Sequence, residues 1–205
     1  MGKFSIYLLP MLLIFFNYTL QMAESAAAQN PNAIDFIKTS CSATRYPALC
    51  VDCLASYATT VQQNEQQLAE AALEVSLSRA QAASTFVYQL SKLKGIKQRE
   101  YLAVKDCIQN MGDTVAQLSQ SLKELGGMRM LAGQNFVWHV DNVKTWVSAA
   151  LTNENTCLYG FSDPAMDGNV KISIRRRVLN CAQVTSNALA LVYRFAARHK
   201  AGDLP

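Results

Sequence analysis

Apolar residues recur at alternating steps of three and four along most of the chain, and residues 101–125 show the pattern most clearly. Eight apolar side chains there fall on one stripe of a helix: Tyr101, Val104, Ile108, Met111, Val115, Leu118, Leu122 and Leu125. The positions between them are mostly polar, so this helix is expected to bury its stripe against other helices. Gly126-Gly127 is expected to end the helix, because glycine adopts left-handed backbone at little cost.

Three further segments, at about residues 64–93, 134–151 and 169–198, repeat the same rhythm. Their stripes include Leu68, Leu73, Leu77, Ala80, Val87 and Leu90, then Phe136, Val140, Val143, Val147 and Ala150, then Ile174, Val178, Cys181, Ala188, Val192 and Phe195. No stretch of the chain beyond the leader alternates with a period of two over more than a few positions. The pattern therefore predicts an all-α fold, an antiparallel four-helix bundle over residues 61–205.

Residues 29–60 predict a separate N-terminal extension made of two short helices around a corner. The corner runs from Cys41 to Tyr46, and Pro47 suits the first turn of the second helix. Neither helix is long enough to be stable alone. We therefore expect an αα-hairpin that precedes the bundle.

Residues 1–28 have the pattern of a secretory signal peptide rather than of a folded segment. Lys3 is followed by an apolar run from Ile6 to Phe16 and by the small residues Ser25 to Ala28, which fit a cleavage site. The apolar run is short for a membrane span, so an uncleaved anchor is the weaker alternative. We expect a secreted protein with one domain and no membrane segment after cleavage.

The charge of the chain excludes one class of partner and leaves others open. The formal net charge is +4, and it stays there without the leader, because Lys3 and Glu24 cancel. This excess is too small for a nucleic-acid-binding protein, but it is compatible with an anionic polysaccharide or an acidic partner surface. The run Arg175-Arg176-Arg177 is interpreted as a solvated helix face.

Six cysteines follow the leader, and in a secreted protein disulfides are their default state: Cys41, Cys50, Cys53, Cys107, Cys157 and Cys181. A Cys41–Cys50 bridge would close the corner of the hairpin. Cys157 lies just past the predicted third helix, where a bridge from Cys107 would join the second helix to the third. Cys53 and Cys181 either pair or remain thiols. Cys50-x-x-Cys53 has a metal-ligand spacing, but no histidine forms a paired motif with a cysteine, so no metal is expected.

The sequence contains no arrangement of residues that is typical of catalysis. It has no nucleophile elbow, no zinc-protease motif and no phosphate-binding loop. His139 stands on an amphipathic helix, where a packing or surface role is favoured, and Trp138 and Trp146 are interpreted as core residues rather than a binding platform. The carboxylates are scattered along polar helix faces. We therefore expect neither an enzyme nor a cofactor.

Four runs of sequence, in this order, carry a resemblance to a known family. They are Cys41-Ser-Ala-Thr-Arg-Tyr-Pro-Ala-Leu-Cys50, the helix around Cys107 with Asp113 downstream, Val147-Ser-Ala-Ala-Leu-Thr-Asn-Glu-Asn-Thr-Cys157, and Ser186-Asn-Ala-Leu-Ala-Leu191. Together they resemble the plant invertase/pectin methylesterase inhibitor family. The resemblance implies the bridges Cys41–Cys50 and Cys107–Cys157 and an unpaired Cys181, whereas Cys53 is an additional cysteine.

Within that family, the resemblance favours a pectin methylesterase inhibitor that acts in the apoplast or cell wall. Invertase inhibitors of the family carry a Pro-Lys-Phe tripeptide, which is absent here. The resemblance implies that polar helix faces near the third and fourth family cysteines cover the pectin-binding cleft of the enzyme: Gln109, Asn110, Asp113, Thr152, Asn153, Asn155 and Thr156. Thr156 matches a contact threonine of the family, and Gln109 replaces a glutamate found in some inhibitors. Desolvation of Asp113 or Glu154 on docking would make binding depend on pH.

Three other functions remain as alternatives to a pectin methylesterase inhibitor. The first is inhibition of an acid invertase, and the second is a bundle that carries a small ligand in its core. The third is the pro-region of a pectin methylesterase, which is less favoured because the sequence stops at Pro205 without a β-rich extension. The oligomeric state is left open.

Overall fold

The computed structural model describes residues 31–128 and 133–202 of the chain, and the predicted leader at residues 1–28 lies outside them. Its helices and short 3₁₀ turns are α2 (Pro31–Cys41), α3 (Pro47–Leu54), η1 (Ala55–Tyr57), α4 (Ala58–Val61), α5 (Glu65–Leu90), α6 (Gln98–Gly126), α7 (Gly133–Tyr159), η2 (Pro164–Met166) and α8 (Asn169–Gly202). These described residues contain no strand. The prediction of an all-α fold is confirmed.

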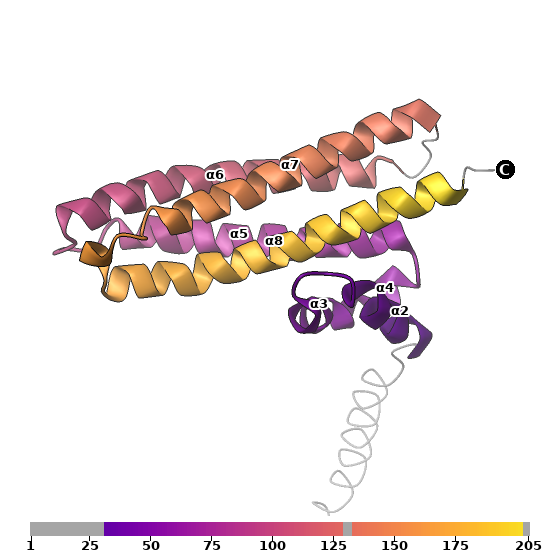
Figure 1. The fold of residues 1–205 in the computed structure, drawn as a ribbon, viewed down its shortest axis with the longest axis horizontal. Coiled ribbons are helices and arrows are strands. Elements are labelled where there is room, and N and C mark those ends of the chain that lie inside the picture. The colour runs from indigo at the N-terminus through magenta and orange to yellow at the C-terminus, as the bar shows by residue number, and fades with distance from the viewer. Residues whose placement is uncertain (1–30, 129–132, 203–205) are drawn as a thin grey trace, which may run out of the picture.

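Helices α5, α6, α7 and α8 run alternately up and down and form the antiparallel four-helix bundle (Figure 1). Helix α6 packs along α7 and helix α5 packs along α8, while α5 also contacts α6 and α7 also contacts α8. The four helices therefore form a closed ring around one core, in which the α6–α7 pair and the α5–α8 pair lie on opposite sides.

The core is built from the predicted stripes. Its largest fully buried side chains include Phe136, Phe161, Leu68, Leu73, Met111, Leu118, Leu125, Ile174 and Leu191. Two aromatic residues depart from the prediction: Tyr101 is 42% exposed and Trp138 is 62% exposed. Tyr101 lies in the first turn of α6, close to the end of the bundle, where fewer side chains are available to cover it.

Helix α7 is longer than predicted, and this is the largest difference from the sequence-based helix bounds. The prediction ended it near residue 151, and residues 152–156 are mostly threonine and asparagine, which are weak helix formers. In the structure the helix continues to Tyr159, and Cys157 lies within it. Tertiary contacts outweigh the local preference here, because the buried stripe continues through Glu154, Cys157 and Phe161.

The ends of the other helices follow common capping rules, with one correction. Asn64 caps α5 by accepting a hydrogen bond from the backbone N–H of Gln67 at 3.0 Å. Gly95, in the turn before α6, has a φ of +83°, which favours glycine. Gly127 does not adopt the expected left-handed conformation: its φ is −76°, and its N–H bonds to the carbonyls of Lys123 and Glu124.

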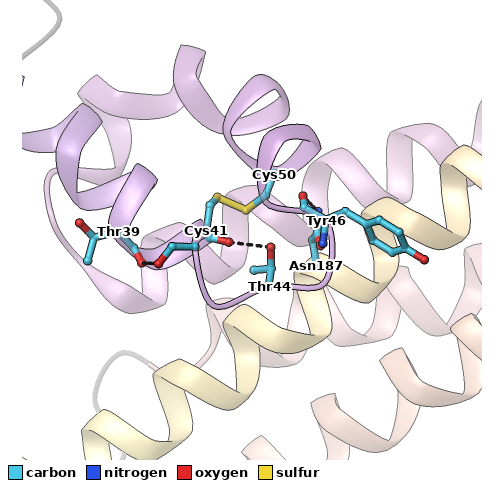
Figure 2. Close-up of a disulfide and its surroundings, with 7 residues drawn as sticks. Thr39, Cys41, Thr44, Tyr46, Cys50 and Asn187 are labelled. Carbon is cyan, nitrogen blue, oxygen red and sulfur yellow. Dashed lines mark hydrogen bonds between the residues drawn. A yellow bond between two sulfur atoms is a disulfide. The ribbon is translucent and has the colours of Figure 1, made fainter.

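Helices α2 and α3 form the N-terminal hairpin, which packs against α5 and α8 (Figure 1). The Cys41–Cys50 disulfide joins the two helices, and Figure 2 shows it beside the corner loop. The side chain of Asn187 on α8 fixes that loop, because its amide donates to the carbonyl of Tyr46 at 2.9 Å and its oxygen accepts from the N–H of Tyr46 at 3.0 Å. The hairpin is thus held by one covalent bond within itself and by a specific polar contact with the bundle.

None of the helices in the described ranges combines the length and apolarity that a membrane span would need.

Candidate functional site

The second disulfide sets the spacing of helices α6 and α7. The Cα atoms of Cys107 and Cys157 are 4.5 Å apart, and both side chains are buried. About two turns further along both helices, the hydroxyl of Thr114 lies 3.3 Å from the carbonyl of Ala150. The two helices are therefore in close contact at the level of the predicted docking residues, and the residues on their outer side are held on a rigid support.

The predicted residues on α6 are partly exposed and bonded to one another. The amide of Gln109 donates to both carboxylate oxygens of Asp113, at 3.1 and 3.2 Å, and both side chains are exposed. Asn110 is half-buried and donates to the carbonyl of Asp106 at 3.0 Å. An approaching partner would meet an amide, a carboxylate and a second amide within two turns of one helix.

Of the predicted residues on α7, two face solvent and one bonds to α6. Thr152 and Thr156 are exposed, and each hydroxyl donates to the carbonyl four residues earlier, at 2.9 Å. Asn153 is half-buried and its amide bonds to the side-chain oxygen of Gln117 on α6 at 3.1 Å. We define the α6–α7 polar face as Gln109, Asn110, Asp113, Thr152, Asn153 and Thr156.

Asn155 points away from the α6–α7 polar face and lines a groove between α7 and α8. The groove encloses about 380 Å³ and is also lined by Thr152 and Thr156, so the two surfaces share an edge. The sequence analysis missed its other lining residues: Arg45, Tyr46, Leu151, Tyr159, Leu179, Ala182, Gln183 and Ser186. Tyr159 is 74% exposed, and its position off the buried stripe, two residues after Cys157, was a signal available in the sequence.

Glu154 was one of two carboxylates, with Asp113, that docking could have desolvated, but the structure shows that it is already fully buried. Its carboxylate accepts hydrogen bonds from the thiol of Cys181 at 3.0 Å and from the hydroxyl of Thr185 at 2.9 Å, both on α8. Burial raises the pKa of Glu154 to about 7, although these two hydrogen bonds oppose the shift. Glu154 therefore belongs to the interior, and Asp113 is the carboxylate of the exposed face.

The remaining cysteines are not joined to each other. Cys181 is a buried thiol, and burial near Glu154 raises its pKa, so it stays protonated. Cys53 is a half-buried thiol on the hairpin. The structure thus contains the two disulfides that the family resemblance implies and leaves Cys53 and Cys181 free.

The α6–α7 polar face offers hydrogen-bonding groups but no arrangement for chemistry. Asp113 is its one carboxylate, the face has no histidine or thiol, and the two threonine hydroxyls are bonded to the backbone. In the part of the chain that the structure describes, no three histidine, cysteine or carboxylate side chains cluster as a metal site would require. This geometry suits the binding of another macromolecule by hydrogen bonds and shape.

Comparisons with known proteins agree with this architecture. Pectinesterase inhibitor 9 of Arabidopsis thaliana is 48% identical over 190 residues, which cover 91% of this chain and 93% of that protein. A 21 kDa protein of Daucus carota is 50% identical over 175 residues, or 85% of this chain and 91% of that protein. The crystal structure of a mutant form of a pectin methylesterase inhibitor from Arabidopsis has the same fold, with a TM-score of 0.59 at 20% identity over 77% of this chain and 95% of that chain.

The sequence model of one family matches most of the chain, at residues 35–191. The match begins at Asp35 within α2 and includes the rest of the hairpin, both disulfides and three of the four bundle helices in full, with α8 up to Leu191. The chain therefore belongs to the plant invertase/pectin methylesterase inhibitor family.

Proposed function

We propose that this protein is a secreted inhibitor of pectin methylesterase. The observation that carries the proposal is the similarity to relatives named pectinesterase inhibitors, at 48% and 45% identity over 91% and 86% of the chain. The sequence pattern of residues 1–28 supports secretion to the apoplast, where such an enzyme would be met.

In the mechanism we propose, the α6–α7 polar face covers the pectin-binding cleft of the enzyme and keeps the substrate out. Inhibition needs no covalent step, in keeping with a face that offers only amides, hydroxyls and one carboxylate. The Cys107–Cys157 disulfide supports this mechanism, because a surface that is already rigid loses little conformational entropy on binding.

The ligand-carrier alternative finds little support in the packing of the protein. The apolar cavity where the hairpin meets the bundle, lined by residues such as Leu54, Ala72 and Val184, encloses about 10 Å³. That is room for about one water molecule. A lipid or hormone would not fit in this cavity unless it displaced the residues that line it.

The proposal is tested by titrating the oxidised mature protein against a plant pectin methylesterase and a plant acid invertase in parallel. We expect the esterase to lose activity at a near-stoichiometric ratio and the invertase to keep it. Invertase is included because the family contains inhibitors of both enzymes. Full esterase activity at a large excess of the protein would refute the proposal.

The position of the docking surface is tested with Thr156→Trp, which adds a large side chain within the proposed contact. We expect inhibitory potency to fall by at least about tenfold, because the bulky ring prevents close approach. Thr145→Trp is a matched control. Thr145 is also an exposed threonine of α7 whose hydroxyl bonds to the carbonyl four residues earlier, and it lies three turns from Thr156. Equal potency of the two folded variants would place the contact elsewhere.

A further inference from the structure

A second surface, on the opposite side of the bundle from the α6–α7 polar face, gathers positive charge from two helices. An open pocket of about 680 Å³ lies between α5 and α8, lined by Arg79, Ala82, Ala83, Phe86, Ser173, Arg176, Arg177 and Asn180. We call it the arginine pocket. It contains three guanidinium groups, and no carboxylate is among its described lining residues.

The arginine pocket exists because the hairpin covers only part of the α5–α8 side (Figure 1). Helix α3 packs against α5 and α8, and its residues line a small cavity together with Ala72 and Val75 on α5 and Val184 and Ala188 on α8. The arginine pocket begins one turn further along α5, beyond the edge of the hairpin, and extends to the N-terminal part of α8. The residues that line the arginine pocket all belong to α5 and α8, so the hairpin leaves this groove open to solvent.

The three arginines of the pocket are not neutralised by any residue that the structure describes. Among the described residues, none of Arg79, Arg176 and Arg177 forms an ion pair, whereas Arg99 and Arg194 elsewhere in the chain bond to Asp163 and Glu65. The guanidinium of Arg177 lies 4.3 Å from the centre of the Phe86 ring, which holds it over a half-buried aromatic face. Three like charges that converge without a counter-charge favour the binding of an anion.

The shape and the other lining groups indicate which anion. The volume lies in the range of small-molecule sites and is large for a single inorganic anion. Guanidinium groups bind carboxylates through paired hydrogen bonds, and three of them on two helices suit several carboxylates along one ligand. The Ser173 hydroxyl and the Asn180 amide can bond to sugar hydroxyls. The face of Phe86 is already occupied by Arg177, which leaves no ring for base stacking.

We propose that the arginine pocket binds a carboxylate-bearing oligosaccharide, a short run of de-esterified pectin backbone. The choice of this ligand rests on the proposed function, because hydrolysis of each methyl ester by the target enzyme leaves one carboxylate on that backbone. The site would hold the protein on polymer that the esterase has already processed, while the α6–α7 polar face on the other side of the bundle stays available for the enzyme.

The test measures the binding of tetragalacturonate to the oxidised mature protein by isothermal titration calorimetry at low salt. The same oligomer with every carboxylate methyl-esterified is the neutral control, and sodium phosphate and sodium sulfate are titrated separately as simple anions. We expect binding of the free-acid oligomer only. Equal binding of the esterified oligomer, phosphate binding as tight as that of the oligomer, or no detectable binding of the oligomer would each overturn the proposal.

Two adjacent arginines provide a matched pair of variants. Arg176 lines the pocket and Arg175 does not, yet both are exposed and each substitution by glutamine removes one charge. We expect Arg176→Gln to weaken oligomer binding by about tenfold, as the loss of a charge-assisted hydrogen-bond pair implies, and Arg175→Gln by less than about twofold. An equal loss of affinity in both variants would mean that the oligomer binds by general electrostatic attraction. That result would refute the arginine pocket as the binding site.

The same variants separate this inference from the proposed function. Arg176→Gln is expected to inhibit pectin methylesterase as well as the unmodified protein does. Loss of inhibition would mean that the arginine pocket contacts the enzyme. It would refute the inference that the pocket is a separate binding site. If the unmodified protein binds tetragalacturonate but leaves the esterase active, the inference that the arginine pocket binds the oligosaccharide is supported and the proposed inhibitory function is refuted. If the protein inhibits the esterase but does not bind tetragalacturonate, only the inference about the arginine pocket is refuted.

Discussion

The two sides of the bundle differ in how they are held together and in what they present to solvent. Helices α6 and α7 are joined by a buried disulfide and carry amides, hydroxyls and the carboxylate of Asp113. Helices α5 and α8 have no disulfide between them in the described residues, are partly covered by the hairpin and carry the arginine pocket. A weakly acidic, cross-linked side thus lies opposite a basic, non-covalently packed one.

This difference shows how one core can support two unlike surfaces. The apolar stripes of all four helices meet in the same interior, so packing leaves the outward positions of each pair free to differ. The interior also connects the pairs, because Glu154 of α7 bonds to Cys181 and Thr185 of α8. A substitution on the α6–α7 side is therefore expected to affect the α5–α8 side only through the shared core, and the converse also holds.

The largest effect is expected from removing the covalent bond of the α6–α7 side. The Cys107→Ser/Cys157→Ser variant opens a loop of 50 residues and should lose about 4 kcal/mol of unfolding free energy on the loop-entropy model. Cys41→Ser/Cys50→Ser opens a separation of nine residues and should lose about 2.5 kcal/mol. Urea denaturation of both variants checks the order, and a larger loss from the hairpin variant would contradict it.

Glu154, which joins the two sides, should make stability depend on pH. Its pKa is about 7 in the folded protein against 4.5 as the ordinary value, so the folded state retains a proton that the unfolded state loses. This group's contribution to the unfolding free energy is fully present below about pH 4.5 and is lost as pH rises to about 7, a decrease of about 3 kcal/mol. Denaturation curves at several pH values measure it.

Glu154→Gln is the control for this pH dependence, because glutamine keeps the shape and cannot ionise. The difference in unfolding free energy between the two proteins should change between about pH 4.5 and about pH 7 and be constant above that range. Parallel pH profiles would show that Glu154 does not titrate in this range. The comparison also cancels the effect of the other carboxylates.

A smaller effect is expected where the hairpin meets α8. Asn187→Ala removes both hydrogen bonds to the backbone of Tyr46 and should cost about 1–3 kcal/mol, because the part-buried N–H of Tyr46 loses its partner and the Tyr46 carbonyl keeps only the N–H of Cys50. Hydrogen exchange should accelerate in residues 42–57 and remain unchanged in α6 and α7. Gln183→Ala on the same helix is the control. Faster exchange throughout the bundle would mean that the hairpin and the bundle unfold as one unit.

The smallest effect on stability is expected from the charges on the two outer surfaces. Arg176→Gln should change the unfolding free energy by no more than about 0.5 kcal/mol, with a slight gain at low salt from reduced repulsion in the arginine pocket. The gain should disappear at about 1 M salt, where screening is strong. Asp113→Asn should show no such gain. Thermal denaturation at both salt concentrations checks this, and a large loss for Arg176→Gln would indicate an unrecognised structural role.

The helical periodicity of the sequence was sufficient to predict the four bundle helices and most core residues. It failed at the second half of α7, where Thr152, Asn153 and Thr156 have weak helix propensity but Glu154, Cys157 and Phe161 continue the buried stripe. The helical periodicity of the sequence, taken alone, places Glu154 on the buried stripe of α7. The prediction treated it instead as a carboxylate that docking could desolvate, and a carboxylate is rarely buried without a partner. Its partners, Cys181 and Thr185, lie more than 25 residues away in the sequence.

The sequence alone determined the helices and which face of each is buried, because these properties depend on residues three or four positions apart. The family resemblance carried by its four runs of sequence added the two disulfides. Only the tertiary structure decided which distant side chains meet: Asn187 with Tyr46, Glu154 with Cys181, and Arg79 with Arg176 and Arg177. Such meetings depend on how packed helices are rotated and aligned against each other, and the packing of the whole core sets that geometry.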